Sequence, residues 1–402
     1  MENKKKWGEE VYPLLSWFKI DKVKNAKVMV VGGGALGNEV IKNLALFGFG
    51  TIVIVDFDTI EYSNLTRSIL YRESDADKGK FKAEVIAEKV KEINPEVNVI
   101  PIVGNLRTDV GLGIYRRMDV VIGCLDNRFA RYYLNRLCFR ANVPWINGGI
   151  ENMGGEAQVY KPKINCHACG LPKDSFEEIE RHFGCPVVSA KNKEAGRVAT
   201  TPILASIIGA VEVQEAMKII HEEPEGKNPF STLCGKVFHY EGMRNTVDVI
   251  KYQNYDDNCF EHEYWEDILE IKELSSNNTI EETFAILREK FKCKSVEINL
   301  LNNYFIESLK SLQSGKTFQV MLPESKLDNY IDQDERLKDL SIMEGLEKKQ
   351  YMDIDKEFSF KNLTLKEIGI PALDVLKVST EKDCFYVELS GDEECYKSLF
   401  KS

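Results

Sequence analysis

Long apolar runs, an excess of basic residues and internal repeats are all absent from this sequence. No apolar stretch reaches the roughly 20 residues that a membrane-spanning helix needs. The start of the chain, MENKKK, is basic, but the apolar run behind it is short and interrupted, and a secretory signal requires a longer one. The formal net charge of -11 at pH 7 disfavours non-specific nucleic-acid binding, which depends on Lys and Arg side chains. We therefore expect a cytoplasmic protein that binds neither a membrane nor nucleic acid.

The composition is that of a globular protein with a substantial core. Hydrophobic residues make up 43% and charged residues 29% of the 402 residues, and this length is sufficient for two or three domains. The ten cysteines would stay reduced in the cytoplasm. Each is therefore expected to be a core residue, a metal ligand or a nucleophile before it is considered for a disulfide.

Apolar strand patterns alternate with helical patterns in the first part of the chain. The apolar run at 26–31 leads into a glycine turn at 32–37 and then a helical pattern, and a second strand at 51–55 ends at Asp56. Further helices are predicted over 83–93 and 130–141, and further strands over 97–103, 119–122 and 143–147. This alternation predicts an α/β, Rossmann-like domain with a mostly parallel sheet and helices on both faces.

The sequence after about residue 163 predicts several different kinds of structure in turn. An irregular stretch covers about 163–200, a long buried helix is predicted over 201–221, and a hairpin over 236–252. The polar segment at 266–278 is typical of a linker. After it, the pattern predicts a helix over 279–291 and strands over 295–301, 317–322, 375–378 and 384–389. We expect a small α+β domain there.

The glycine turn is the first motif with a chemical meaning. Gly32, Gly34 and Gly37 form GxGxxG between a strand and a helix. Glycines let the backbone approach a phosphate, and the helix N-terminus offers free N–H groups. Asp56 ends the next strand, where an acid can accept hydrogen bonds from ribose hydroxyls. By itself, this pattern would favour a dinucleotide dehydrogenase.

The motifs that follow argue against hydride transfer. They are Asp56-Phe57-Asp58-Thr59-Ile60, Ser63-Asn64-Leu65-Thr66-Arg67, Gly79-Lys80-Phe81-Lys82 and Asp126-Asn127. Attack of a carboxylate on the α-phosphate of ATP needs cations around the phosphates and an acid that holds Mg²⁺. Arg67 and Lys82 could supply the cations, and Asp126 follows a strand end, where ligands bind in open α/β sheets. Any one Lys or Arg could be a solvated surface charge, so the ordered set carries the inference.

These motifs resemble a known adenylation domain over roughly residues 20–262. Ubiquitin-activating enzymes share this domain with the bacterial activators of sulfur carriers for thiamin and molybdopterin synthesis, the ThiF/MoeB type. The resemblance implies an ATP-dependent adenylyltransferase that acts on the C-terminus of a ubiquitin-like protein. It also implies a dimer.

The resemblance assigns roles to individual residues. Asp56 would bind ribose, Asn64 and Arg67 would contact the nucleotide, Lys82 would contact phosphate, and Asp126 would bind Mg²⁺. The glycines of the turn, Asp58 and Asn127 would complete the nucleotide site. Many members also carry an N-terminal Arg pair that reaches the partner subunit's ATP. The first arginine of this chain is Arg67, so the source of that cation and the dimer arrangement stay open.

Two half-sites with metal-ligand spacing lie far apart in the sequence. Cys166-x-x-Cys169 supplies two ligands from one turn, and Cys259-x-x-His262 is a possible second pair. Zinc takes four N or S ligands in a tetrahedron. The related enzymes carry paired CxxC motifs at these two places, and zinc accepts the histidine. His167 is an alternative ligand, and the cysteines could also be free turn residues.

Cys185 lies in the irregular segment, after Phe183 and Gly184. A lone cysteine is more often a small core residue than a nucleophile. The related ubiquitin-activating enzymes have their thioester-forming cysteine in a similar place, so the resemblance implies that Cys185 is the nucleophile. A thiolate is the reactive form, and nearby cationic candidates by sequence are Arg181, His182, Lys191 and Lys193.

The sulfur-carrier activators place a cysteine slightly later, before an Ala-Gly pair. Here the pair is Ala195-Gly196 and the position holds Asn192, so that cysteine is missing. The pattern of the C-terminal region resembles the ubiquitin-fold (β-grasp) domain that recruits the conjugating enzyme in eukaryotic ubiquitin-activating enzymes. The alternative is an unrelated α+β domain.

The sequence therefore predicts three parts. Residues 1–265 form the adenylation domain, with the cysteine segment at about 170–200; residues 266–278 form a linker; and residues 279–402 form the ubiquitin-fold-like domain. We expect an enzyme that uses ATP, Mg²⁺ and Zn²⁺, forms a thioester on Cys185 and passes it to a conjugating enzyme. The alternatives are a sulfur-carrier adenylyltransferase, a non-catalytic nucleotide-binding scaffold and, last, a nicotinamide dehydrogenase.

Overall fold

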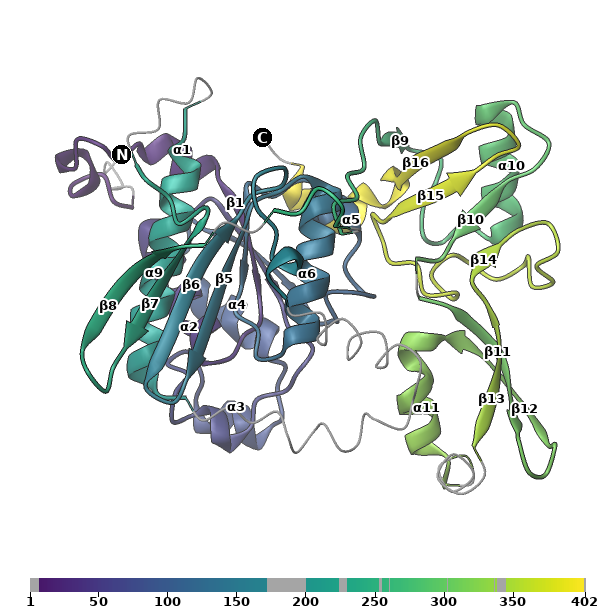
Figure 1. The fold of residues 1–402 in the computed structure, drawn as a ribbon, viewed down its shortest axis with the longest axis horizontal. Coiled ribbons are helices and arrows are strands. Elements are labelled where there is room, and N and C mark those ends of the chain that lie inside the picture. Colours follow the sequence, from purple (N-terminus) through teal and green to yellow (C-terminus); the bar gives the residue numbers. More distant parts are fainter. Residues whose placement is uncertain are drawn as a thin grey trace, which may run out of the picture.

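The structure is a computed structural model of the full chain. It describes residues 7–171, 200–223, 230–252, 255–259, 261–301, 303–335, 337 and 345–400. A large sheet with helices on both faces holds the first part of the chain, and two smaller sheets hold the C-terminal part (Figure 1). Within the described ranges, no helix is both long and apolar enough to cross a membrane.

The large sheet has eight strands in the order β3-β2-β1-β4-β5-β6-β7-β8. The strands are β1 (Lys27–Val31), β2 (Thr51–Val55), β3 (Asn98–Ile102), β4 (Val120–Gly123), β5 (Trp145–Glu151), β6 (Gly154–Tyr160), β7 (Lys236–Glu241) and β8 (Thr246–Lys251). The pairings from β3 to β5 are parallel, and those from β5 to β8 are antiparallel. This confirms the predicted mostly parallel α/β class, and β7 with β8 is the predicted hairpin.

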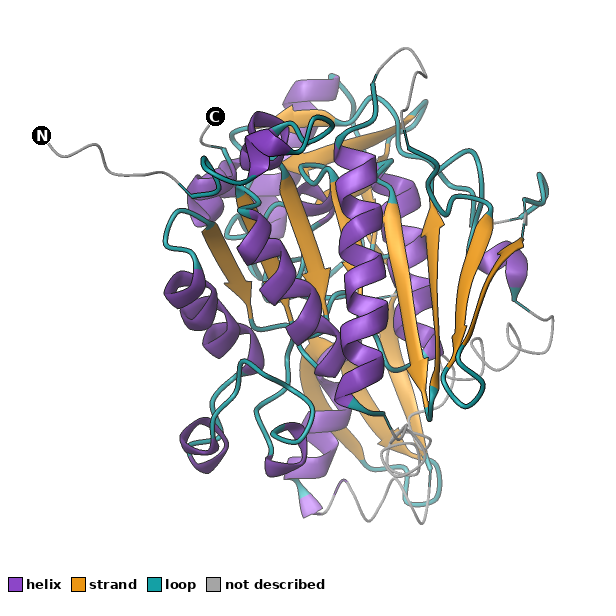
Figure 2. Ribbon diagram, turned by 90° about the vertical axis from the view of Figure 1, so that its left-hand side faces the viewer, coloured by secondary structure: helices purple, strands orange, loops and turns teal. Residues whose placement is uncertain are grey.

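Helices cover both faces of this sheet (Figure 2). They are α1 (Ile20–Asn25), α2 (Ala35–Phe47), α3 (Glu73–Asp77), α4 (Lys82–Ile93), α5 (Leu112–Tyr115), α6 (Arg128–Ala141) and α9 (Pro202–Ile220). Successive residues of a strand point to opposite faces. Val28 and Val30 of β1 accordingly join the core under α2, α4 and α9, whereas Met29 and Val31 join the core under α5 and α6. This two-sided burial explains why β1 and β2 are apolar after their first residues, Lys27 and Thr51.

The C-terminal part contains a five-stranded sheet crossed by one helix. The strand order is β14-β10-β15-β16-β9, with one parallel pair, β9 with β16. The elements are β9 (Leu269–Ile271), α10 (Ile280–Phe291), β10 (Glu297–Asn299), β14 (Asp353–Ile354), β15 (Val375–Ser379) and β16 (Cys384–Leu389). A capping box between Thr279 and Glu282 begins α10, whose apolar side packs into the core of this sheet. The predicted α+β composition is confirmed.

Two features of this part differ from the sequence-based expectation. The predicted linker 266–278 contains β9 and the fully buried Leu274. The chain between β10 and β14 forms a separate three-stranded sheet of β11 (Phe305–Ser311), β12 (Thr317–Pro323) and β13 (Leu346–Tyr351), next to α11 (Leu327–Gln333). Short 3₁₀ helices complete the described elements: η1 (Tyr12–Leu14), η2 (Tyr62–Asn64), η3 (Ala168–Gly170), η5 (Glu324–Lys326) and η6 (Ser390–Leu399).

A buried carboxylate joins the five-stranded sheet to the end of α5. Glu388 of β16 has no exposed surface and accepts hydrogen bonds from the guanidinium groups of Arg116 and Arg117. The arginines lower the pKa of Glu388, while burial acts in the opposite direction. Asp374 adds a second link, because its Oδ1 accepts a hydrogen bond of 2.9 Å from the Leu112 N–H.

We predict that Glu388→Ala destabilises the protein by about 3–5 kcal/mol, because removal of one partner leaves buried charges uncompensated. Glu270 provides the matched control, since it lies 3.7 and 3.8 Å from the same two arginines but its side chain is 50% exposed. Glu270→Ala should cost less than about 1 kcal/mol. Urea unfolding midpoints measure both; equal losses would mean that Glu388 does not carry the junction.

Candidate functional site

The carboxyl ends of three neighbouring strands form one edge of the large sheet. Val31 at the end of β1 is in register with Val55 of β2 and with Gly123 of β4. The residues that follow these strands are therefore neighbours: the glycine turn after β1, Asp56 after β2 and the segment 124–126 after β4. Ligands of open parallel sheets bind at such an edge.

The glycine turn is tightly packed on one side and open on the other. Gly32 has a φ of +102°, and a Cβ there would lie 2.3 Å from the Cys124 carbonyl oxygen. A Cβ on Gly37 would lie 1.9 Å from the Gly32 carbonyl oxygen, whereas one on Gly34 would meet nothing within 4 Å. No side chain caps the N-terminus of α2 at Gly34. The turn thus presents an uncapped helix end, which suits an anion.

Asp56 holds the turn in place. Its Oδ2 accepts a hydrogen bond of 2.6 Å from the Gly33 N–H, and its Oδ1 accepts one of 2.8 Å from the Asp58 N–H. Burial raises the pKa of Asp56, and Lys82 nearby opposes that rise. A carboxylate has about four acceptor positions, so two remain for a ligand.

A second acid positions the lysine of this edge. The Lys82 Nζ lies 2.8 Å from Oδ2 of Asp58, and the Lys82 N–H donates to the Asp58 carbonyl. Lys82 begins α4 and is only 9% exposed. Arg67 is half-buried and has no ion-pair partner within the described ranges. Asn64 is buried, and its Oδ1 accepts a hydrogen bond of 2.9 Å from the Glu61 N–H.

Asp126 and Asn127 follow β4 at the same edge. Asp126 is exposed, and its Oδ1 accepts a hydrogen bond of 3.2 Å from the Asn127 amide. The Asn127 side chain also caps α6, because its Oδ1 accepts a hydrogen bond of 2.8 Å from the Ala130 N–H. Asn127 therefore has a structural task that the sequence pattern did not reveal.

Two titratable residues behind this edge, the half-buried Arg131 and the buried Glu212, were not anticipated. The Arg131 Nη2 donates to the carbonyl oxygens of Leu125 and Gly148, at 2.7 and 3.3 Å. Glu212 of α9 has no exposed surface, and neither of its carboxyl oxygens has a hydrogen-bond partner within the described chain. Its carboxyl group lies against Gly148, where a Cβ would come within 2.4 Å. The signal available in the sequence was an acid inside an apolar helix.

The ionisation of Glu212 follows from this burial. Loss of solvent raises the pKa of Glu212 well above its ordinary value, and the nearby Arg131 opposes the rise only in part. Burial also lowers the pKa of Arg131. Burial therefore favours the neutral, protonated form of Glu212.

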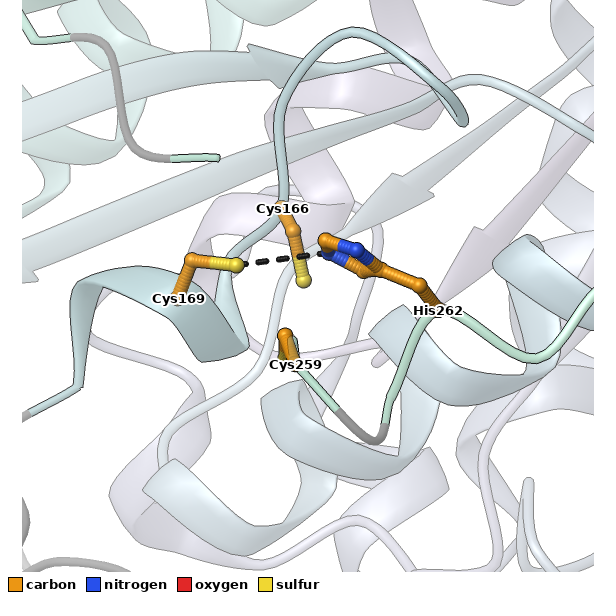
Figure 3. A group of neighbouring side chains, drawn as sticks. All are labelled: Cys166, Cys169, Cys259 and His262. Carbon is orange, nitrogen blue, oxygen red and sulfur yellow. Dashed lines mark hydrogen bonds between the residues drawn. The ribbon is translucent and has the colours of Figure 1, made fainter. Parts of the chain in front are cut away.

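Cys166, Cys169, Cys259 and His262 converge on one point (Figure 3). Their ligand atoms all lie within 4.8 Å of one another, and Sγ of Cys169 is 3.3 Å from Nε2 of His262. Around zinc, four such atoms would be about 3.5–3.8 Å apart, given the usual bond lengths. Three sulfurs and one nitrogen thus fit a tetrahedral site after small side-chain movements. The two half-sites, about 90 residues apart in the chain, are brought together.

Burial of this cluster affects the ionisation of its cysteines. Burial raises the pKa of the Cys166 thiol to about 12 and that of Cys259 to about 11. A bound cation would lower both, because the ligating form is the thiolate. His167 lies outside the cluster: its Nδ1 is 3.3 Å from the Tyr160 hydroxyl, and its ring meets Trp145 edge-on. Cys185 and the candidate cations around it lie outside the described residues.

The chain belongs to the ThiF family, which it matches over residues 8–260. It is similar to the SAMP-activating enzyme E1 of Haloferax volcanii, 31% identical over 57% of this chain and 77% of that protein. It is also similar to the molybdopterin-synthase adenylyltransferase of Salmonella typhimurium, 32% identical over 55% and 81%. The SUMO-activating enzyme subunit 2 of Dictyostelium discoideum is 38% identical over 37% of this chain, but the match spans only 22% of that longer protein.

We predict that Glu212→Gln stabilises the protein increasingly as the pH rises above about 4.5, the ordinary value for a glutamate. In this range the unfolded chain loses a proton that the folded chain keeps, so the stability of the wild-type protein falls with pH by up to about 1.4 kcal/mol per unit. The stability of Glu212→Gln does not fall in this way, because the glutamine side chain does not titrate.

Urea unfolding of both proteins at pH 5, 7 and 8.5 measures the difference. Glu223→Gln is the control, because ion pairs with Lys19 and Lys22 lower the pKa of Glu223. This variant should lose stability by the same amount at all three pH values, since all of them lie above the ordinary pKa of a glutamate. A pH-independent difference for Glu212→Gln would show that Glu212 is ionised in the folded state.

Proposed function

We propose that this protein is an ATP-dependent enzyme that adenylates the C-terminal carboxylate of a small ubiquitin-like or sulfur-carrier protein. One observation carries the proposal. The glycine turn, Asp56, Lys82 and Asp126 share the edge at which β2, β1 and β4 end, in a chain of the ThiF family. The names of its relatives point to the same reaction.

The residues of the edge fit the demands of this reaction. The uncapped turn would receive the phosphates, and the remaining acceptor positions of Asp56 would bind the ribose hydroxyls. Lys82 and Arg67 would face the phosphates, with Asn64 beside them. Asp126 would hold Mg²⁺, which supplies charge neutralisation at the phosphates.

The chemistry is a transfer of AMP. A carboxylate oxygen of the substrate protein attacks the α-phosphorus of ATP, and the bond to the bridging oxygen of pyrophosphate breaks. The negative charge that builds up on the phosphates is met by Lys82 and Arg67. Lys82 already sits against Asp58 at 2.8 Å, so this ion pair has to loosen or share its cation when phosphate binds.

The finer proposal continues the reaction at Cys185. Its thiolate attacks the acyl carbon of the adenylate, AMP leaves, and a thioester remains. The C-terminal domain, proposed as residues 279–402, would then dock a conjugating enzyme, and the adenylation domain, proposed as residues 1–265, would work as a dimer. Support comes from the sequence resemblance around Cys185 and from the α+β composition of the C-terminal part.

A sulfur-carrier adenylyltransferase is the second candidate. The molybdopterin-synthase adenylyltransferase of Salmonella typhimurium matches a larger share of its own length than the SUMO-activating subunit does. The adenylation step would be the same, but the acyl group would end as a thiocarboxylate on the carrier. Asn192 at the place of the family's cysteine favours the first candidate.

We propose zinc for the cluster of Cys166, Cys169, Cys259 and His262. The donor set of three thiolates and one imidazole has no room for an open coordination position, which is typical of a structural rather than a catalytic zinc. Bound zinc would hold the segment before α9 to the segment before β9.

The adenylation prediction compares variants of two proposed site residues with a variant of a neighbouring lysine. Lys82→Ala and Asp126→Asn should lower carrier-dependent exchange of pyrophosphate into ATP by about 100-fold or more, because charge on the phosphates is no longer compensated. Lys80→Ala is the control, since Lys80 pairs with Asp75 at 3.0 Å and its side chain is 37% exposed; it should stay within about twofold. If Lys82→Ala kept the wild-type rate of pyrophosphate exchange, the proposed nucleotide site would be wrong.

The same mixtures separate the two candidate functions. With a ubiquitin-like partner, mass spectrometry should detect an adduct that reducing agent removes and that Cys185→Ala abolishes, while pyrophosphate exchange in that variant persists. Exchange without any such adduct in the wild-type protein would favour the sulfur-carrier function and leave Cys185 without a catalytic role.

For the metal, we predict that Cys169→Ser lowers bound zinc well below one equivalent and lowers the melting temperature. The physical reason is that three ligands bind zinc more weakly than four, and zinc affinity adds to folding stability. Cys384→Ser, at an exposed cysteine, is the control and should keep the metal. Elemental analysis of the purified proteins measures the bound zinc. Equal zinc contents in Cys169→Ser and in the wild-type protein would exclude Cys169 as a ligand.

A further inference from the structure

Two buried side chains hold the carbonyl oxygen of Gly33 in the glycine turn. Asn38 donates to this oxygen from Nδ2 at 2.8 Å, and Tyr71 donates to it from its hydroxyl group. Asn38 has no exposed surface, and Tyr71 is only 4% exposed. Burial raises the pKa of Tyr71, so the hydroxyl keeps the proton that it donates. The proposed function gives neither side chain a role.

These two hydrogen bonds fix the orientation of the peptide group between Gly33 and Gly34. In a trans peptide, the carbonyl and the following N–H point in opposite directions. Because buried donors hold the Gly33 carbonyl oxygen, the Gly34 N–H points away from them. The surroundings of Gly34 are open, since a Cβ there would meet nothing within 4 Å. Within the described ranges the Gly34 N–H makes no hydrogen bond, so it is available to a ligand.

Asp56 does not fix this peptide group. It accepts a hydrogen bond from the Gly33 N–H, which belongs to the preceding peptide. Glycine populates positive and negative φ about equally, so the peptide between two glycines could turn over if Asn38 and Tyr71 did not hold it. A turned peptide would present the Gly33 carbonyl oxygen to the open side, where it would repel an anion.

The amide of Asn38 also joins the glycine turn to the segment that carries Arg67. Its Nδ2 donates to the Gly34 carbonyl oxygen at 3.0 Å, and its Oδ1 accepts a hydrogen bond of 2.9 Å from the Leu70 N–H, three positions after Arg67. The side chain therefore donates twice and accepts once. A carboxylate of the same size could not make the two donor contacts.

We propose that Asn38 and Tyr71 are positioning residues that aim the Gly34 N–H at a phosphate of ATP. They contact the Gly33 carbonyl and not the nucleotide, and they act by excluding the turned peptide. The inference rests on the proposed function, from which it takes the nucleotide at the glycine turn. It follows that loss of these side chains weakens the binding of the phosphates and leaves the binding of the nucleoside unchanged.

The experiment measures the affinity of the full chain for ATP with Mg²⁺, and for adenosine, by isothermal titration calorimetry. Tyr71→Phe removes one hydroxyl and should lower the affinity for ATP about threefold, because Asn38 still holds the carbonyl. Asn38→Ala should lower it about tenfold or more. The affinity for adenosine should stay within about twofold in both variants, since the acceptor positions of Asp56 are unchanged.

Tyr115→Phe and Asn94→Ala are the matched controls. The Tyr115 hydroxyl donates to the Leu106 carbonyl oxygen at 3.2 Å, and the Asn94 Nδ2 donates to the Ala45 carbonyl oxygen, near the other end of α2, at 3.0 Å. Tyr115 and Asn94 have no exposed surface. Both variants lose a comparable buried hydrogen bond, and both should keep the wild-type ratio of ATP affinity to adenosine affinity.

The outcomes separate this inference from the proposed function. Equal losses of ATP and adenosine affinity in Tyr71→Phe, or no loss of either, would overturn the positioning role. A wild-type protein that binds no ATP would overturn both proposals. If the wild-type protein binds ATP without exchanging pyrophosphate, and the variants lose ATP affinity alone, the adenylation proposal falls and the positioning role stands. Should Asn38→Ala fail to fold, Tyr71→Phe decides, because phenylalanine keeps the ring.

Discussion

The parallel hydrogen bonding of β1 between β2 and β4 is the constraint on which the rest of the site depends. It places the carboxyl ends of three strands side by side. The residues that follow these strands therefore become neighbours through the pairing of the strands, although they are far apart in the sequence. Three sets of contacts then fix this edge. Asp56 clamps the glycine turn, Asp58 positions Lys82, and Arg131 holds the segment after β4 against β5.

The parts of the site that the sequence could predict are those with a local pattern. GxGxxG after an apolar strand and an acid at the next strand end specify the edge, and the two half-sites of the metal cluster specify a donor set. The capping task of Asn127 and the two backbone bonds of Asp56 were out of reach. They depend on where a side chain turns after folding, and spacing alone carries no information about that.

The C-terminal part shows a different limit. Strand β9 has only three residues, too few for an alternation to stand out. It exists because β16 offers a parallel edge, and the paired residues are 118 positions apart in the chain. The three-stranded sheet of β11, β12 and β13 interrupts the larger sheet between β10 and β14. Glu212 was overlooked for a related reason, since the sequence of an apolar helix does not reveal whether an acid within it finds a partner after folding.

The two backbone hydrogen bonds that Asp56 accepts have a consequence for the entropy of ligand binding. Flexible glycine loops normally lose conformational freedom when they close on a ligand, and that loss weakens affinity. Here the Gly33 N–H is already held by a carboxylate that also fixes Asp58, and through it Lys82. In the proposed function, the loop and Lys82 would therefore be ordered before a nucleotide arrives, and binding free energy could go to contacts that strengthen in the transition state.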